Sequence, residues 1–169
     1  MTKQKFDWDL LTKEDFDLAE EILGPRAGTN PDLVIAPDGV PYLYRWHHIR
    51  AAEANTYFHI QVASDPERPL HDHPWDNMSV ILAGGYDEIY ARWPPHGNEY
   101  ERELRKGDVV FRSAREAHRL ILPEEFMYTM TLFSTGPKVR EWGFWYPEGW
   151  RPFTDVTRVK DGMSVHVKP

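Results

Sequence analysis

The chain has 169 residues, 41% hydrophobic and 28% charged, which is the composition of one folded globular domain. It has no cysteine, which excludes a disulfide framework, thiolate metal ligands and a cysteine nucleophile. A net charge of −7 argues against nucleic acid or an anionic membrane surface as a partner, so we expect a small-molecule substrate. No segment approaches the roughly 20 apolar residues of a membrane span, and we expect a cytoplasmic protein.

Residues 12–23 have the pattern of an amphipathic helix. Thr12 can cap the first turn, where acidic residues gather, and Gly24 and Pro25 end the segment. One apolar stripe is formed at helical spacing by Phe16, Ala19, Ile22 and Leu23. We expect a packing helix outside the main core, within an N-terminal extension of residues 1–30.

From residue 31 onward the pattern changes to short runs rich in Val, Ile, Tyr, Phe and Thr. Nine strands are predicted, at residues 42–49, 55–62, 78–82, 86–92, 100–105, 109–112, 118–122, 128–134 and 141–146. Gly84-Gly85 predicts a hairpin turn, and residues 94–98 a looser one. The fold class is therefore all-β, a closed sandwich or barrel over 42–146 within a single domain of residues 1–169, followed by a C-terminal tail at 147–169.

Three histidines can meet in such a barrel. Alternate residues of an extended chain face the same way, so His71 and His73 project to one side and can chelate one metal ion. His118 begins a later strand, after a turn at Gly107, and a barrel can bring it across to complete the set. The alternative is three histidines hydrogen-bonded in a polar interior without a metal.

This arrangement resembles the first motif of the cupin superfamily, a glycine, five residues, H-x-H, three or four residues, a glutamate, six residues and a glycine. His71, His73 and Gly84 match in register, whereas Asp65 replaces the first glycine and Asn77 the glutamate. The resemblance implies a cupin-type double-stranded β-helix, or jelly-roll barrel, with a divalent metal ion held by three histidines.

The second cupin motif is matched at Gly107 and His118, while its other three positions carry Ser113, Arg115 and Leu122. The wider sequence also resembles bacterial and phage cupins labelled cysteine-dioxygenase-like. The resemblance supplies a hypothesis of dioxygenase chemistry and no substrate.

Asn77 changes the charge of the site. An asparagine binds a metal only through a neutral amide oxygen, or not at all, so three imidazoles would leave a charge of about +2. Such a centre attracts an anionic substrate and keeps open coordination positions. Iron(II) is favoured for a three-histidine oxygenase; zinc, nickel and manganese stay open.

Other side chains are weaker candidates. His59 and Tyr128 could take part in catalysis if they face inward, although an outward polar face is the commoner outcome for the strand of His59. Arg112 or Arg119 could hold a substrate carboxylate, and Trp75 could contact the substrate. Asp72, between two candidate ligands, is expected to be solvated or to cap a turn.

Three functions follow as alternatives. The first is a mononuclear non-haem metal dioxygenase acting on a small anionic substrate. The second is a metal-dependent isomerase or lyase, and the third is a non-catalytic ligand-binding or structural cupin. A homodimer would cover the edges of the sheets, so we expect one.

Overall fold

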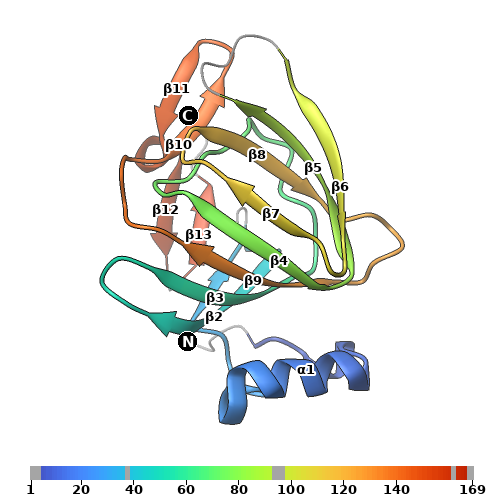
Figure 1. Ribbon diagram of the computed structural model, residues 1–169. Helices are drawn as coiled ribbons and strands as arrows, with labels where there is room; N and C mark the ends of the chain where they lie inside the picture. The colour runs from blue at the N-terminus through green and yellow to red at the C-terminus, as the bar shows by residue number, and fades with distance from the viewer. Residues whose placement is uncertain (1–4, 37–38, 93–97, 161–162, 167–169) are drawn as a thin grey trace.

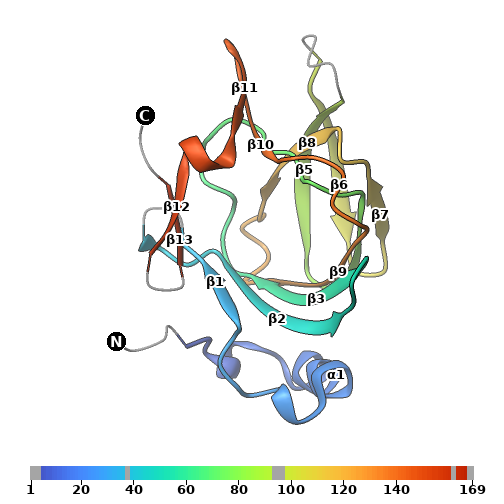
Figure 2. The same cartoon turned by 90° about the vertical axis from the view of Figure 1, so that its left-hand side faces the viewer.

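The β-strands form two walls that face each other, and one helix packs outside them (Figures 1 and 2). This computed structural model describes residues 5–36, 39–92, 98–160 and 163–166, and only the backbone of 157–160 and 163–166. No helix of the described chain is long and apolar enough to cross a membrane.

The larger sheet has eight strands in the order β12-β13-β1-β2-β3-β9-β4-β7. Their bounds are β1 (Leu33–Ile35), β2 (Leu43–Arg50), β3 (Asn55–Gln61), β4 (Asn77–Ala83), β7 (Val109–Arg112), β9 (Thr129–Thr135), β12 (Thr157–Lys160) and β13 (Met163–His166). All the pairs are antiparallel except β1 with β13, which is parallel.

The opposite wall contains a three-stranded sheet, β6-β5-β8, and a two-stranded sheet, β10-β11. The bounds here are β5 (Gly85–Arg92), β6 (Tyr100–Arg105), β8 (Glu116–Ile121), β10 (Gly143–Tyr146) and β11 (Gly149–Pro152). His71 joins the two sheets, because it forms isolated antiparallel bridges with His118 of β8 and Phe144 of β10. The first candidate ligand is thus fixed by its own backbone beside the third.

Helix α1 (Lys13–Leu23) lies against the outer face of β2 and β3 (Figure 2). The Thr12 side chain caps it by accepting the N–H of Asp15, and Gly24 ends it with a φ of 58°. Its buried apolar stripe packs on a cluster that includes Trp46, Phe58 and Met130. Each large apolar side chain buried there contributes about 1.5–3 kcal/mol.

This helix determines which face of the neighbouring strands points inward. In β2, Trp46 points to the helix, whereas Leu43 and Arg45 line the interior. In β3, Phe58 and Ile60 belong to the cluster under the helix, so His59 and Gln61 face the interior. Arg45, His59 and Gln61 therefore bring polar groups to this wall of the interior, because most of the large apolar side chains of the same strands pack under the helix.

The nine predicted strands and the helix are present, with small shifts at their ends. The last predicted strand begins at Gly143, not at residue 141, and residues 147–169 contribute β11, β12 and β13. The turn predicted at residues 94–98 falls mostly outside the described residues.

The prediction of a hairpin at Gly84-Gly85 is wrong, because the chain crosses there from β4 in one sheet to β5 in the other. Gly84 has a φ of 65°, and a Cβ atom on it would lie 2.3 Å from the carbonyl oxygen of Tyr128. Glycine is needed at this crossing both for its backbone conformation and for space.

Candidate metal centre

A cavity of about 340 Å³ lies between the two sheets. Its lining includes apolar side chains such as Leu33, Leu43 and Phe133 together with several histidines and arginines. A concave, largely apolar space with a few convergent polar groups is the usual form of a small-molecule site.

Three histidines from two places in the chain converge on this cavity. His71 and His73 come from the segment before β4, and His118 comes from β8. Their candidate ligand atoms all lie within 4.8 Å of one another, and the Nε2 atoms of His73 and His118 are 2.9 Å apart. Among the described residues, no Asp, Glu or Cys completes a larger group with them.

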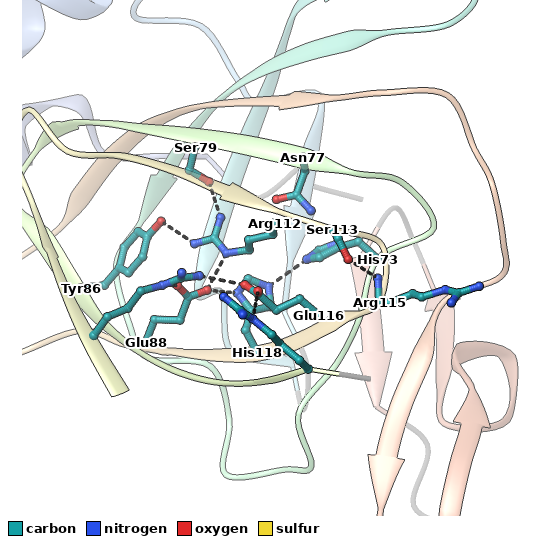
Figure 3. Close-up of polar contacts among 12 residues, drawn as sticks. His73, Asn77, Ser79, Tyr86, Glu88, Arg112, Ser113, Arg115, Glu116 and His118 are labelled. Atoms are coloured by element: carbon teal, nitrogen blue, oxygen red, sulfur yellow. Dashed lines mark hydrogen bonds and ion pairs between the residues drawn. The ribbon is translucent and has the colours of Figure 1, made fainter. Parts of the chain in front are cut away.

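Glu88 of β5 fixes the orientation of His118 (Figure 3). Its Oε1 atom lies 2.5 Å from the Nδ1 atom of His118, and the Glu88 side chain is fully buried. An ionised carboxylate can only accept, so His118 carries its proton on Nδ1 and leaves Nε2 free toward His73. No carboxylate is among the three candidate ligands, but the Glu88 carboxylate binds the opposite side of the His118 ring from Nε2.

Two arginines neutralise the buried Glu88 carboxylate. Arg112 donates from Nε at 2.5 Å, and Arg102 donates from Nε at 2.5 Å. Burial alone would raise the pKa of Glu88, but the hydrogen bond from His118 and the charge of Arg112 hold it well below its usual range. Glu88 is therefore an anion throughout the neutral range.

Asp72 is placed between the two ligands of the H-x-H motif and is fully buried. Its carboxylate accepts the backbone N–H of Gly143 at 2.7 Å, the indole N–H groups of Trp145 and Trp150 at 2.9 and 3.0 Å, and Arg140 at 2.6 Å. The expectation of a solvated or turn-capping Asp72 is wrong. The residue ties the β10-β11 hairpin to the segment that carries His71 and His73.

Burial favours the uncharged form of His71 and His73. It lowers the pKa of His71 and of His73 well below the ordinary value, and the proximity of His118 lowers both further. Neutral imidazoles offer lone pairs, which is the state that metal binding requires.

The residues present fit a divalent ion. Two nitrogen ligands about 2.1 Å from one ion, at right angles, would be about 3.0 Å apart, close to the spacing of the His73 and His118 Nε2 atoms. Without an ion, one of these two atoms would have to carry a proton. An all-imidazole set suits iron(II), zinc, nickel or copper better than magnesium or calcium.

Solved structures with the same architecture identify the fold. The iron(II) form of HppE matches with a TM-score of 0.51 and 14% identity over 76% of this chain and 78% of its own. The DMSP lyase DddQ from Ruegeria pomeroyi DSS-3 matches with a TM-score of 0.51 and 21% identity over 69% of this chain and 58% of its own. The chain has a cupin fold. No protein-family model and no curated protein matches it, and the narrower resemblance to cysteine-dioxygenase-like cupins stays a prediction.

The two arginines expected to hold a substrate, Arg112 and Arg119, lie in different environments. Arg112 faces the cavity, but its guanidinium is bound to Glu88, Ser79 and Tyr86 (Figure 3). Arg119 neighbours His118 on β8 and does not line the cavity. The charge of Arg112 is thus already paired with Glu88, and substrate binding by Arg112 or Arg119 stays a prediction.

The two candidate catalytic residues lie in different places. Tyr128 is outside the cavity of the cupin, where its hydroxyl donates to Asp15 at 2.5 Å and accepts the N–H of Thr12. A role for Tyr128 at the metal does not fit this position. His59 does line the cavity, and the commoner outward arrangement is wrong for its strand because α1 covers the outer face.

Trp75 and Asn77 flank the ligands. Trp75 lines the cavity and stacks on His73, with ring centroids 5.3 Å apart. Asn77 donates to the carbonyl of Trp75 at 3.4 Å, and its Oδ1 atom is buried without a hydrogen-bond partner in the described part of the chain. Its side chain does not line the cavity, and ligation by Asn77 stays a prediction.

Sequence reasoning missed Glu88, Arg45 and Arg68, of which the two arginines line the cavity. Glu88 and Tyr86 are two residues apart on β5, so their side chains lie on the same face of the strand. This two-residue spacing was the one signal in the sequence that Glu88 faces inward. Arg45 shares its face with Leu43, so the same period applies. Arg68 lies in a loop, where no period exists.

Proposed function

We propose that this cupin is a mononuclear metal-dependent dioxygenase that acts on a small anionic molecule, with iron(II) as the metal. One observation carries the proposal: His71, His73 and His118 converge on one wall of a cavity large enough for a small substrate. The structurally similar HppE was crystallised with iron(II), which makes this metal the first to test.

The ligand set carries no charge of its own. With no carboxylate in the group, a divalent ion would keep its full charge, and an anionic substrate would neutralise it. When bound, such an ion supplies positive charge and open coordination positions for substrate and dioxygen. Dioxygen is the oxidant, and because both of its atoms enter the product no separate reductant is required.

The chain itself contributes orientation and shielding. Glu88 holds the His118 proton on Nδ1, so that Nε2 stays available in the cavity. Trp75 and Phe133 contact His73, with ring centroids 5.3 and 5.7 Å away, and keep water from that side. These apolar contacts strengthen the electrostatic interactions of any bound anion.

The test is oxygen consumption by the iron(II)-loaded protein against a panel of small organic acids, with His71→Ala as the inactive control. Uptake that requires iron(II), an acid and His71 supports the proposal. Turnover under argon with zinc or manganese would instead indicate an isomerase or lyase. If no acid is turned over under either condition while a ligand still binds, the non-catalytic alternative replaces the enzyme.

A further inference from the structure

Arg45 presents a positive charge to the cavity without a matching carboxylate. Its Nε donates to the Nε2 atom of His59 at 2.8 Å, and its guanidinium carbon lies 4.6 Å from the centre of the Tyr57 ring. These contacts hold the planar group in place, and its two terminal nitrogens make no hydrogen bond within the part of the chain that the structure describes. Within the described residues, Arg45 makes no ion pair.

Arg68 is the second arginine of this kind. It lines the same cavity, its guanidinium carbon lies 4.9 Å from the centre of the Phe144 ring, and its Nε is buried without a hydrogen-bond partner. No carboxylate in the described chain pairs with it. A buried guanidinium donor that lacks a partner is costly, and an anion bound there would satisfy it.

Each of the two arginines contacts a ring neighbour of the candidate metal ligands. Phe144, which lies under the Arg68 guanidinium, has its ring centroid 6.1 Å from that of His71. His59, which accepts from Arg45, and His73 both contact the Phe133 ring, with centroids 5.3 and 5.7 Å away. Both charges therefore act at the same end of the cavity as the three histidines. An anion held by the arginines would lie beside the metal.

The charge of the lining indicates a monoanion. Arg112 is neutralised by Glu88, and Asp65 is the one carboxylate among the described lining residues. Asp65 accepts the N–H of Leu120 at 2.9 Å and pairs with neither free arginine. In the metal-free cavity, two free arginines and one aspartate leave one positive charge, which suits a carboxylate better than a phosphate or phosphonate dianion.

Apolar side chains supply much of the remaining cavity wall. Leu33, Ile35 and Leu43 line it from the large sheet, and Trp75, Phe133 and Trp142 supply aromatic faces. We infer that the substrate of the proposed enzyme is a carboxylic acid with an apolar or aromatic body, and that Arg45 and Arg68 bind its carboxylate. This inference rests on the proposed function only in placing the acid beside a metal ion.

The test uses 3-phenylpropanoate, with its neutral amide and 2-phenylethylphosphonate as comparisons. Binding to the full chain is followed through the fluorescence of the cavity tryptophans and by calorimetry, in metal-free and zinc-loaded protein. We expect the acid to bind at least about tenfold more tightly than the amide and, in metal-free protein, more tightly than the phosphonate. Equal affinity for acid and amide, or no saturable binding of the acid, would overturn the inference.

Variants locate the contact. Arg45→Met and Arg68→Met should each weaken binding of the acid by about 10- to 100-fold, the usual cost of losing a charge-assisted hydrogen bond, with little effect on the amide. Arg50→Met is the matched control, because Arg50 lies at the exposed end of the same strand. Arg68 is in a loop, so its variant keeps the test decisive if Arg45→Met does not fold.

The experiment distinguishes failure of the carboxylate site from failure of the proposed dioxygenase. If the arginine variants weaken acid binding in metal-free protein but the histidines bind no metal, the carboxylate site stands and the dioxygenase falls. If metal binds and acid affinity depends on the metal but on neither arginine, the metal centre stands and the carboxylate site is wrong.

Discussion

The Nδ1 atom of His118 lies 2.5 Å from the Oε1 atom of Glu88, and both side chains are buried in the wall between β5 and β8. This pair connects a candidate ligand to a charge network that extends through Arg112 and Arg102. The orientation of the ligand therefore depends on a carboxylate that never reaches the cavity. This dependence can be measured.

Glu88→Gln should weaken metal binding by about 10- to 100-fold, because the amide no longer provides the negative charge that fixes and polarises His118. It should also cost about 3–5 kcal/mol of stability, since Arg112 stays buried beside it. Metal titration and chemical denaturation measure the two effects. Glu116→Gln is the control, because Glu116 shares Arg102 but does not touch His118. Equal metal affinity in both variants would contradict the role of Glu88.

Tyr128→Phe should affect stability and leave metal binding unchanged. The hydroxyl joins Asp15 of α1 to the barrel, and its loss should cost about 1–3 kcal/mol. Thermal unfolding and a metal titration on the same sample give both readouts. Weaker metal binding in this variant would mean that Tyr128 acts at the site after all.

Asp72→Asn should loosen the β10-β11 hairpin. The amide cannot accept all four hydrogen bonds that Asp72 accepts, and one partner is the charged Arg140. We expect a loss of about 2–4 kcal/mol and faster hydrogen exchange at the indoles of Trp145 and Trp150. Asp76→Asn, which affects only the bond from the N–H of Ala114, should cost less. Indole exchange at the wild-type rate would show that the hairpin is held by other contacts.

The stability of the metal-free protein should fall in weak acid. Burial, and then the charge of Arg45, lower the pKa of His59 well below 6.5, so the unfolded chain binds a proton that the folded chain rejects. The stability contributed by a neutral His59 is therefore complete above about pH 6.5 and is lost as the pH falls toward the folded pKa. His71 and His73 add to this slope.

His59→Gln should make the acid limb shallower by up to about 1.4 kcal/mol per pH unit. Urea titrations at a series of pH values, compared with wild type, measure this difference. His48→Gln is the control, because His48 is exposed. Identical slopes in wild type and His59→Gln would show that folding does not lower the pKa of His59.

The strands and the convergence of three histidines were predictable because both depend on short periods in the sequence. The two histidines of an H-x-H pair lie on the same face of any extended segment, whatever its place in the fold. The sequence did not show which face of β3 points into the cavity, since this depends on α1 covering the opposite face. Glu88 and Arg45 were missed for a related reason: charged residues in alternating strands usually face solvent. The substrate class and the homodimer stay predictions.

The central claim is that His71, His73 and His118 hold one divalent ion. Elemental analysis of protein purified without added metal, run beside His118→Ala and the exposed-residue control His48→Ala, tests it most directly. Wild type and His48→Ala should carry comparable amounts of one divalent metal, and His118→Ala should have lost most of it. Equal metal content in all three proteins would contradict the account.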